Sequence, residues 1–537
     1  MTIDWGQLRR IQACLVIAAT LSVPFAGRAL AATPPDTLVQ AWAIDDIIGL
    51  DPAEAFEISA GEMLGNSYDR LVRLDIDDPS QLVNDLAEEW QVSEDGRTFT
   101  FTLRDGMTFA SGNPITADDV AWSIQRAVKL DKSPAFILTQ FGLTPENVES
   151  RARATDARTF VFETDQAYAP SFVLNCLTAN VAAVVDRQLV EAEARDGDFG
   201  NGWLRTHYAG SGPMTIRDWR PNEILVLERN ERYHGEQAKL TRVIYRNVRE
   251  SATQRLMLQS GDIDVARNLQ PNDLDQIANL DTVRVISAPK GTIYYFSLNQ
   301  KHPELAKPEV REAFKYLVDY DGIQASLIKG IGEIHQNFLP KGMLGASEES
   351  PYHLDVDKAK SLLAEAGLGD GFSITMDVRN TQPVTGIAES VQQTMAEAGV
   401  RLEIIPGDGA QTLTKYRARS HDMYIGQWGV DYWDPHTNAD TFASNPDNAD
   451  DSGVSTLAWR NSWDIPELTQ ESRAAVLESD TDARIALYDD LQRKVREQGP
   501  YVFLFQQTEV AAVANGVQGY RLGPSFDTNY VYNVSKE

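Results

Sequence analysis

The sequence predicts an α/β protein of several domains, in which helices cover sheets and smaller α+β elements occur beside them. Two observations predict this. The chain has 537 residues, of which 42 % are hydrophobic, and at about 150 residues per domain this length suffices for several packed cores. Along the chain, runs with a period of two alternate with helical patterns that end in Ala-Gly and lead directly into strands.

The first clear elements lie between residues 76 and 199. Thr98–Leu103 alternates between threonine and apolar residues, which predicts a strand with one buried face. Thr116 followed by Asp119 is a capping pair, and the apolar residues after it recur on one helical face. A second alternating run covers Thr159–Thr164. We therefore expect a separate α+β unit over residues 76–199.

A helix followed by a strand occurs twice in the second half of the chain. Asp355 is the expected N-cap of a helix that ends at Gly367, and the next strand is predicted over Phe372–Val378. The same order recurs with a helix over Ile387–Ala398 and a strand over Val400–Ile405. This order predicts an α/β domain whose sheet is covered by helices.

The N-terminal residues have the order of a secretory signal peptide. Arg9 and Arg10 precede the apolar run Ile11–Phe25, and small residues surround an expected cleavage site near Ala31. The alternative is a membrane anchor, but the apolar run is shorter than the roughly 20 residues that a spanning helix needs. We expect residues 1–31 to be removed and the mature protein to be exported.

The charge and the scarcity of metal ligands exclude several functions. The 49 Lys and Arg against 78 Asp and Glu give a net charge of −29, which repels nucleic acids and anionic membrane surfaces. The seven histidines are scattered, and no two have the helical i, i+4 spacing of a metal site. We expect no metal and no other cofactor. Cys176, the cysteine of the mature chain, is expected to be a buried apolar residue.

The sequence lacks the motifs of common enzymes, which predicts a protein that is not an enzyme. It has no G-x-x-x-x-G-K phosphate loop, no G-x-G-x-x-G dinucleotide motif, no G-x-S-x-G elbow and no H-E-x-x-H zinc motif. Some pair among so many carboxylates will lie at glycosidase distance by chance, so their number does not indicate hydrolysis.

Residues 424–463 are unusually aromatic. Seven of these 40 residues are aromatic, against 9 % in the whole chain, and Asp431, Asp434 and Asp440 lie among them. One interpretation is an aromatic core beneath a long loop. The other is a ligand pocket, in which rigid aromatic walls supply contact area and a desolvated carboxylate selects a ligand amine.

Short motifs follow one another in a fixed order along the mature chain. They are Leu86-Ala87-Glu88-Glu89-Trp90, Asn113-Pro114-Ile115-Thr116-Ala117-Asp118-Asp119-Val120, Gly210-Ser211-Gly212-Pro213, Gly261-Asp262-Ile263-Asp264, Val310-Arg311-Glu312-Ala313 and Ala359–Gly367. Each motif is weak alone. Their order and spacing together resemble the extracellular solute-binding proteins of family 5, which are the dipeptide, oligopeptide and nickel receptors of ABC importers.

The resemblance implies a periplasmic-binding-protein-like fold with two lobes, an extra inserted domain and a hinged ligand cleft. The implied domains are domain I (32–75, 200–289 and 507–537), the inserted domain II (76–199) and domain III (290–506), which forms the second lobe. The segments Gly291–Asn299 and Tyr501–Gln507 would cross between the lobes and act as the hinge.

The resemblance also implies a ligand site. Peptide receptors of the family hold the ligand α-amino group with an aspartate in a W-x-x-D-x-x-(D/E)-P motif, which residues 428–435 match. Asp431 would therefore bind the amine. The expected ligand-binding set is Asp431, Trp428, Tyr432, Trp433 and Tyr295. No arginine or lysine aligns with the group that binds the peptide carboxylate, so that role stays unassigned.

These inferences predict the substrate-binding receptor of an ABC importer. It would capture a short peptide or similar amine-bearing solute in the periplasm and deliver it, as a monomer, to permease subunits in the inner membrane. One alternative is a receptor of the same family for an opine, an oligosaccharide, or a nickel or haem chelate. Another is a secreted hydrolase that uses Asp431 and Asp434 as acid and base.

Overall fold

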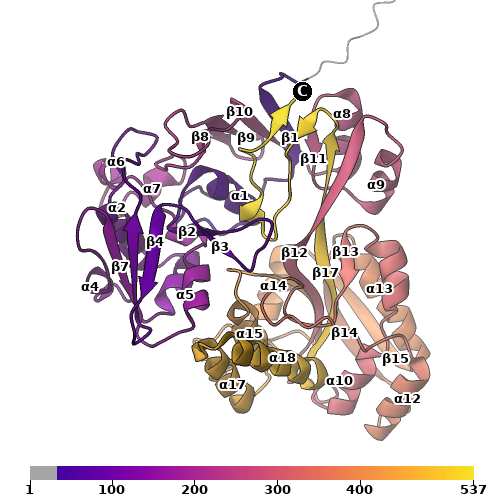
Figure 1. Cartoon of the computed structure of the whole chain (residues 1–537). Helices are drawn as coiled ribbons and strands as arrows, with labels where there is room; N and C mark the ends of the chain where they lie inside the picture. Colours follow the sequence, from indigo (N-terminus) through magenta and orange to yellow (C-terminus); the bar gives the residue numbers. More distant parts are fainter. Residues whose placement is uncertain (1–32) are drawn as a thin grey trace, which may run out of the picture.

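The computed structural model describes residues 33–537, so the predicted signal peptide (1–31) lies outside the described residues. A mixed sheet of 11 strands runs through the molecule (Figure 1). In order across the sheet, the strands are β15 (Val400–Gly407), β14 (Phe372–Arg379), β16 (Met423–Gly429), β12 (Val283–Leu298), β17 (Tyr501–Ala514), β11 (Val265–Ala266), β1 (Thr37–Trp42), β10 (Arg242–Asn247), β9 (Ile224–Arg229) and β8 (Met214–Arg220), with β13 (Gly332–Ile334) paired to β17. No helix within residues 33–537 is both long and apolar enough to span a membrane.

Two long strands, β12 and β17, join the two halves of this sheet. They pair antiparallel from Val283 opposite Ala514 to Ser297 opposite Tyr501, and their register shifts between Pro289 and Ile293. Figure 1 shows them side by side, running from the part that contains β1 and β10 to the part that contains β14 and β15. The two segments expected to cross between the lobes, Gly291–Asn299 and Tyr501–Gln507, lie mostly within these strands. The expected domain limit near 290 falls inside β12, and the limit near 506 falls inside β17.

One half of the sheet is centred on β1. This strand is buried along its whole length because parallel strands, β10 and β11, flank it on both sides. Three helices accompany this half: α1 (Ile58–Ser67), α8 (Ser251–Ser260) and α9 (Pro271–Ile277). A short 3-10 helix, η4 (Phe526–Thr528), packs against α1 where Gly65 meets the carbonyl of Asp527. A side chain at residue 65 would collide with that carbonyl, so glycine allows this close contact.

The other half confirms the two predicted helix–strand units. Its helices include α10 (Pro308–Lys315), α12 (Val356–Glu365) and α13 (Val384–Glu397). The Asp355 carboxylate accepts the Lys358 backbone N–H at 2.8 Å, as expected of an N-cap, and Gly367 adopts the left-handed conformation with φ 75° after α12. The strands β14 and β15 begin at Phe372 and Val400, where the sequence predicts them.

The unit predicted over residues 76–199 contains a separate antiparallel sheet. Its strands, in spatial order, are β4 (Ala87–Val92), β5 (Thr98–Leu103), β7 (Thr159–Glu163) and β6 (Ala152–Ala154). The predicted alternation of β5 buries Phe99 and Phe101. Helix α2 (Ala117–Leu130) begins with a capping box between Thr116 and Asp119, which confirms the predicted helix start.

Cys176 ends α5 (Pro170–Cys176) inside the core of this unit, and its side chain is fully buried. Burial raises the pKa of the thiol well above its ordinary value. We expect a thiol reagent to leave Cys176 unmodified in the native mature protein and to label it fully in denaturant. Rapid labelling of the native protein, measured by mass spectrometry, would contradict this expectation.

Candidate functional site

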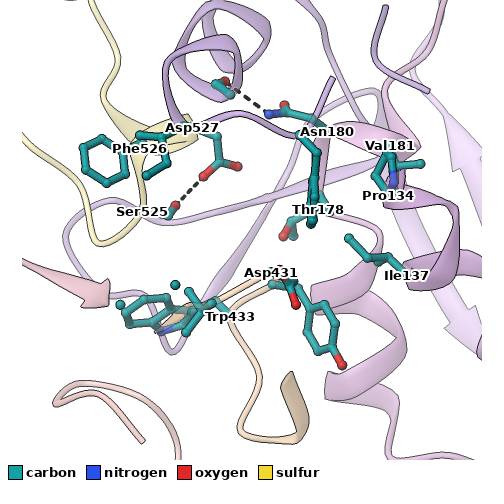
Figure 2. Close-up of a pocket in the computed structure, with 18 of the residues that line it drawn as sticks. Pro134, Ile137, Thr178, Asn180, Val181, Asp431, Trp433, Ser525, Phe526 and Asp527 are labelled. Atoms are coloured by element: carbon teal, nitrogen blue, oxygen red, sulfur yellow. Dashed lines mark hydrogen bonds between the residues drawn. The ribbon is translucent and has the colours of Figure 1, made fainter. Parts of the chain in front are cut away.

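A cavity of about 250 Å³ lies where the two halves of the large sheet meet the smaller unit (Figure 2). Its wall consists of residues 55–58, 178–181, 429–433 and 524–527, with Gly61, Leu74, Pro134, Ile137, Gly291 and Thr292 beside them. This volume has room for roughly eight water molecules, so it encloses a small solute or one end of a longer one.

The end of β16 brings residues 429–433 into this wall. Gly429 lies opposite Thr292 of β12, and the Val430 N–H donates to the Gly291 carbonyl at 3.0 Å. A Cβ built on Gly291 would lie 2.6 Å from Val430 and 2.9 Å from Trp433. Glycine at position 291 therefore permits the loop to pack closely on the strand that crosses between the halves.

Asp431 is a partly buried carboxylate in the cavity wall. Figure 2 shows it below Thr178, between Trp433 and Ile137. Burial raises its pKa to about 7, and no cationic group among the described residues lowers it. The loop is held in place because the Asp431 N–H donates to Thr437 Oγ1 at 3.1 Å. The arrangement leaves a desolvated carboxylate without a cation.

Two aromatic residues beside Asp431 also line the cavity. Tyr432 and Trp433 are each 6 % exposed. Tyr432 extends from the loop into the core of the smaller unit, where its ring centroid lies 5.8 Å from that of Phe172. This side chain connects the two parts of the molecule that the cavity separates.

Asp434 has a different environment although it belongs to the same motif. It forms a bidentate ion pair with Arg484, with distances of 2.7 and 2.9 Å, and both side chains are almost fully buried. Its Oδ1 also accepts the His436 N–H at 3.0 Å. Asp434 is absent from the cavity wall. Because Asp434 is already paired with Arg484 and lies outside the wall, the structure argues against a hydrolase in which Asp431 and Asp434 act as acid and base.

Trp428 and Tyr295 lie outside the cavity wall, which differs from the expectation for both. Tyr295 is 1 % exposed and packs edge-on against Phe442 and Tyr501, with ring centroids 5.3 and 6.0 Å away. Trp428 is half-buried on β16 opposite Ile293. Both side chains extend from strands into the aromatic core beside the cavity.

Sequence reasoning missed Glu57, Asn180 and Asp527, which also line the cavity. They come from segments far apart in the chain, and no local motif marks them. The Asn180 side chain donates to the Gly61 carbonyl at 3.1 Å and accepts from buried Arg70 at 2.6 Å. Arg70 also lies 3.9 Å from Asp527, so Arg70 links Asn180 and Asp527 of the wall in one polar group.

The cavity wall is acidic. Three carboxylates line it, from Glu57, Asp431 and Asp527, and none of the described residues in the wall is a lysine, an arginine or a histidine. A neutral or anionic group would leave Glu57 and Asp431 without a cationic partner, which is costly where water is excluded. The wall therefore favours a cationic ligand group.

A second cavity of about 580 Å³ adjoins the first, and the two share Ile58 and Phe526. Unlike the first, its wall includes two arginines, Arg267 and Arg379, beside the carboxylates of Asp45, Asp46 and Glu509. Arg267 is buried and pairs with Glu62 and Glu509. Arg379 is exposed and has no carboxylate within 4.0 Å among the described residues. It is thus free to meet an anionic group.

A buried charge cluster supports the cavity from the crossing strands. Lys290 of β12 lies 2.7 Å from Glu509 of β17, and its ammonium also donates to the Gly523 carbonyl at 2.6 Å and to Asn529 Oδ1 at 2.9 Å. Residues 524–527, which form part of the wall, lie between these two anchor points. The cluster therefore fixes the C-terminal segment to the strands that join the halves.

Within residues 33–537, no three or more His, Cys, Asp or Glu side chains gather in a way that could hold a metal ion. The described part of the cavity wall offers carboxylates, amides and aromatic rings. Its chemistry suits the binding of an organic cation.

The fold and this site define a class of protein. Two lobes joined by a pair of sheet strands, with a cavity whose wall includes residues from both, are the architecture of a two-lobe solute-binding protein. The chain belongs to the bacterial extracellular solute-binding proteins of family 5, because the family model "Bacterial extracellular solute-binding proteins, family 5 Middle" matches residues 81–450. This membership confirms the resemblance found in the sequence motifs.

Individual relatives agree with this assignment. The probable D,D-dipeptide-binding periplasmic protein DdpA of Escherichia coli K12 is 28 % identical over 97 % of each chain. The dipeptide-binding protein of the same strain is 26 % identical over 88 % of this chain and 89 % of its own. The periplasmic binding protein DppA of Helicobacter pylori, solved in complex with the peptide STSA, superposes with a TM-score of 0.78 at 25 % identity over 93 % of this chain and 98 % of its own.

Proposed function

We propose that this protein is the substrate-binding receptor of an ABC importer and that it captures a short peptide with a free amino end. The observation that carries the proposal is Asp431, a desolvated carboxylate without a cation partner among the described residues, in the wall of a cavity between the lobes. A ligand ammonium would supply the missing charge. The names of DdpA and of the dipeptide-binding protein, which are similar over nearly the whole chain, support a peptide as the solute.

The two cavities give the bound peptide a direction. The amino end lies in the first cavity against Asp431, and the chain continues past Ile58 and Phe526 into the second cavity. Arg379 is then the residue that meets the peptide carboxylate, because Arg267 is occupied by Glu62 and Glu509. The receptor works as a monomer in the periplasm, where it passes the peptide to permease subunits of the inner membrane.

Ligand binding is expected to raise thermal stability without chemical change. A ligand that binds only the native state adds about 2.7 kcal/mol to the free energy of unfolding at a hundredfold excess over Kd. The solute that co-purifies with the protein should be identified by mass spectrometry of the denatured sample. Thermal-shift measurements with di- and tripeptides, opines and oligosaccharides then compare the classes.

We expect short peptides with a free amino group to give the largest increase in melting temperature, and N-acetylated versions of the same peptides to give none. Equal shifts from free and acetylated peptides would contradict the role of the amine. Conversion of the added peptide beyond one equivalent would identify an enzyme rather than a receptor.

A further inference from the structure

We propose that the first cavity selects peptides whose first residue carries a second positive charge, as a lysine side chain does. The inference rests on the proposed function and specifies its solute class. In the bound state Asp431 pairs with the α-ammonium, and Glu57 pairs with the cation of the first side chain.

Two carboxylates in the cavity wall have no cationic partner among the described residues. Of the three carboxylates in the wall, Asp527 is partly compensated by Arg70, which lies 3.9 Å away and is 2 % exposed. Asp431 and Glu57 have no lysine, arginine or histidine nitrogen within 4.0 Å among the described residues. A peptide with a neutral first side chain compensates only one of these two carboxylates.

Glu57 is half-buried at the start of α1, and its surroundings disfavour its negative charge. Burial raises the pKa of Glu57, and the neighbouring Asp46 and Glu54 raise it further. Within the described residues, the hydrogen bond to its carboxylate comes from the Phe56 N–H, at 3.2 Å. A ligand cation beside Glu57 would relieve this unfavourable environment.

An acidic residue at the start of a helix usually caps it by accepting a backbone N–H of the first turn. In α1, Asp46 does this instead of Glu57. Glu57 occupies the N-cap position, but its side chain makes no capping hydrogen bond. Instead, the Asp46 carboxylate accepts the Ser59 N–H at 3.2 Å, and the Ser59 hydroxyl also donates to it. The Glu57 carboxylate is therefore free to serve the cavity.

The apolar lining near Glu57 fits the methylene chain of a lysine. Phe56, Ile58, Pro134 and Ile137 line the cavity together with Glu57. Phe56 and Phe136 pack edge-on at 6.0 Å between centroids, although they are 44 % and 43 % exposed. A lysine side chain can cover such apolar surface with its methylene groups while its ammonium reaches a carboxylate.

The test compares two dipeptides that differ by one charged group. Lysyl-alanine and norleucyl-alanine have the same backbone and nearly the same apolar side chain, but only the lysine carries a side-chain ammonium. Calorimetry on the full mature protein should give lysyl-alanine a Kd about tenfold to hundredfold lower, as expected for a partly buried ion pair. Equal affinity for the two dipeptides would overturn the inference.

Glu57→Gln should reduce this preference to nearly one, because the glutamine amide no longer forms an ion pair with the lysine side chain. Glu54→Gln is the matched control, because Glu54 lies three residues away, pairs with Arg205 at 3.4 Å and is absent from the cavity wall. This control should keep at least the full preference, because loss of the Glu54 charge makes Glu57 easier to ionise. A preference that survives Glu57→Gln would overturn the assignment to Glu57.

A third probe separates this inference from the proposed function. The diamine 1,5-diaminopentane carries two ammonium groups and no peptide bond. If the folded protein binds the diamine and neither dipeptide, the peptide function is wrong and the charge selection is supported. If norleucyl-alanine binds as tightly as lysyl-alanine, the peptide function holds and the selection is wrong. Binding of none of the three would overturn both.

Discussion

Asp431→Asn should weaken binding of the co-purified solute by about 30-fold to several thousandfold, because it leaves a ligand ammonium buried without its partner. The melting temperature of the empty protein should stay the same or rise. An unpaired, desolvated carboxylate disfavours the folded state, and the neutral amide removes that cost. Calorimetry and thermal unfolding of the same preparation measure the two quantities.

The pH dependence of this effect has a definite sign. Burial raises the pKa of Asp431 to about 7, so the folded, empty protein binds a proton more readily at this residue than the unfolded chain does. The contribution of Asp431 to stability therefore becomes less favourable as the pH rises from the unfolded value near 4 toward 7. Solute affinity should rise over the same approach to pH 7, because only the ionised carboxylate pairs with an ammonium. Asp431→Asn should remove the contribution of Asp431 to both trends.

Asp434→Asn supplies the contrasting variant. Since Asp434 pairs with buried Arg484, this substitution should lower the melting temperature and leave any surviving folded protein with nearly normal affinity. If Asp431→Asn behaved in this way instead, Asp431 would be a structural residue of the loop rather than a ligand contact.

Glu509→Gln should lower the free energy of unfolding by about 3 to 5 kcal/mol, because it removes the shared partner of two buried cations. Arg267 and Lys290 both pair with Glu509, and the three side chains are at most 6 % exposed. Burial alone would raise the pKa of Glu509, but the two cations outweigh it and hold the pKa at about 2. Urea unfolding at neutral pH measures the loss.

The loss of stability at low pH provides a second measurement of the role of Glu509. A carboxyl whose pKa is lower in the folded state stabilises the protein above its unfolded pKa, near 4.3, and this stability is lost as the pH falls toward 2. The variant should lack this part of the pH dependence. Glu333→Gln is a matched control, because Glu333 is exposed and pairs with Lys341 at the surface. Glu333→Gln should lower the free energy of unfolding by less than about 1 kcal/mol.

The elements with local signals could be predicted from the sequence. The capping pair of Thr116 and Asp119, the N-cap Asp355 and the terminating Gly367 each depend on a few neighbouring residues, and each is found at the predicted position. The two-lobe fold could be predicted because motifs spread along the chain resemble those of one family. The domain limits and the ligand-binding roles of residues stay predictions.

The composition of the cavity wall could not be predicted, because it depends on contacts between distant segments. Asp431 and Asp434 differ by three positions in one motif, yet only Asp434 meets a cation, and that cation is 50 residues away. Glu57 and Asp527 reach the same wall from opposite ends of the chain. Tyr295 matches the aromatic character of a pocket residue, but its strand directs it into the core.

The position of β17 has a consequence for the order in which the chain is made. This strand lies between β12 and β11 in the middle of the large sheet, yet it is the last long strand to be synthesised. Until residues 501–514 emerge from the ribosome, both halves of the sheet have an open edge, and until residues 524–527 follow, the cavity lacks part of its wall. A nascent chain therefore cannot close around its solute.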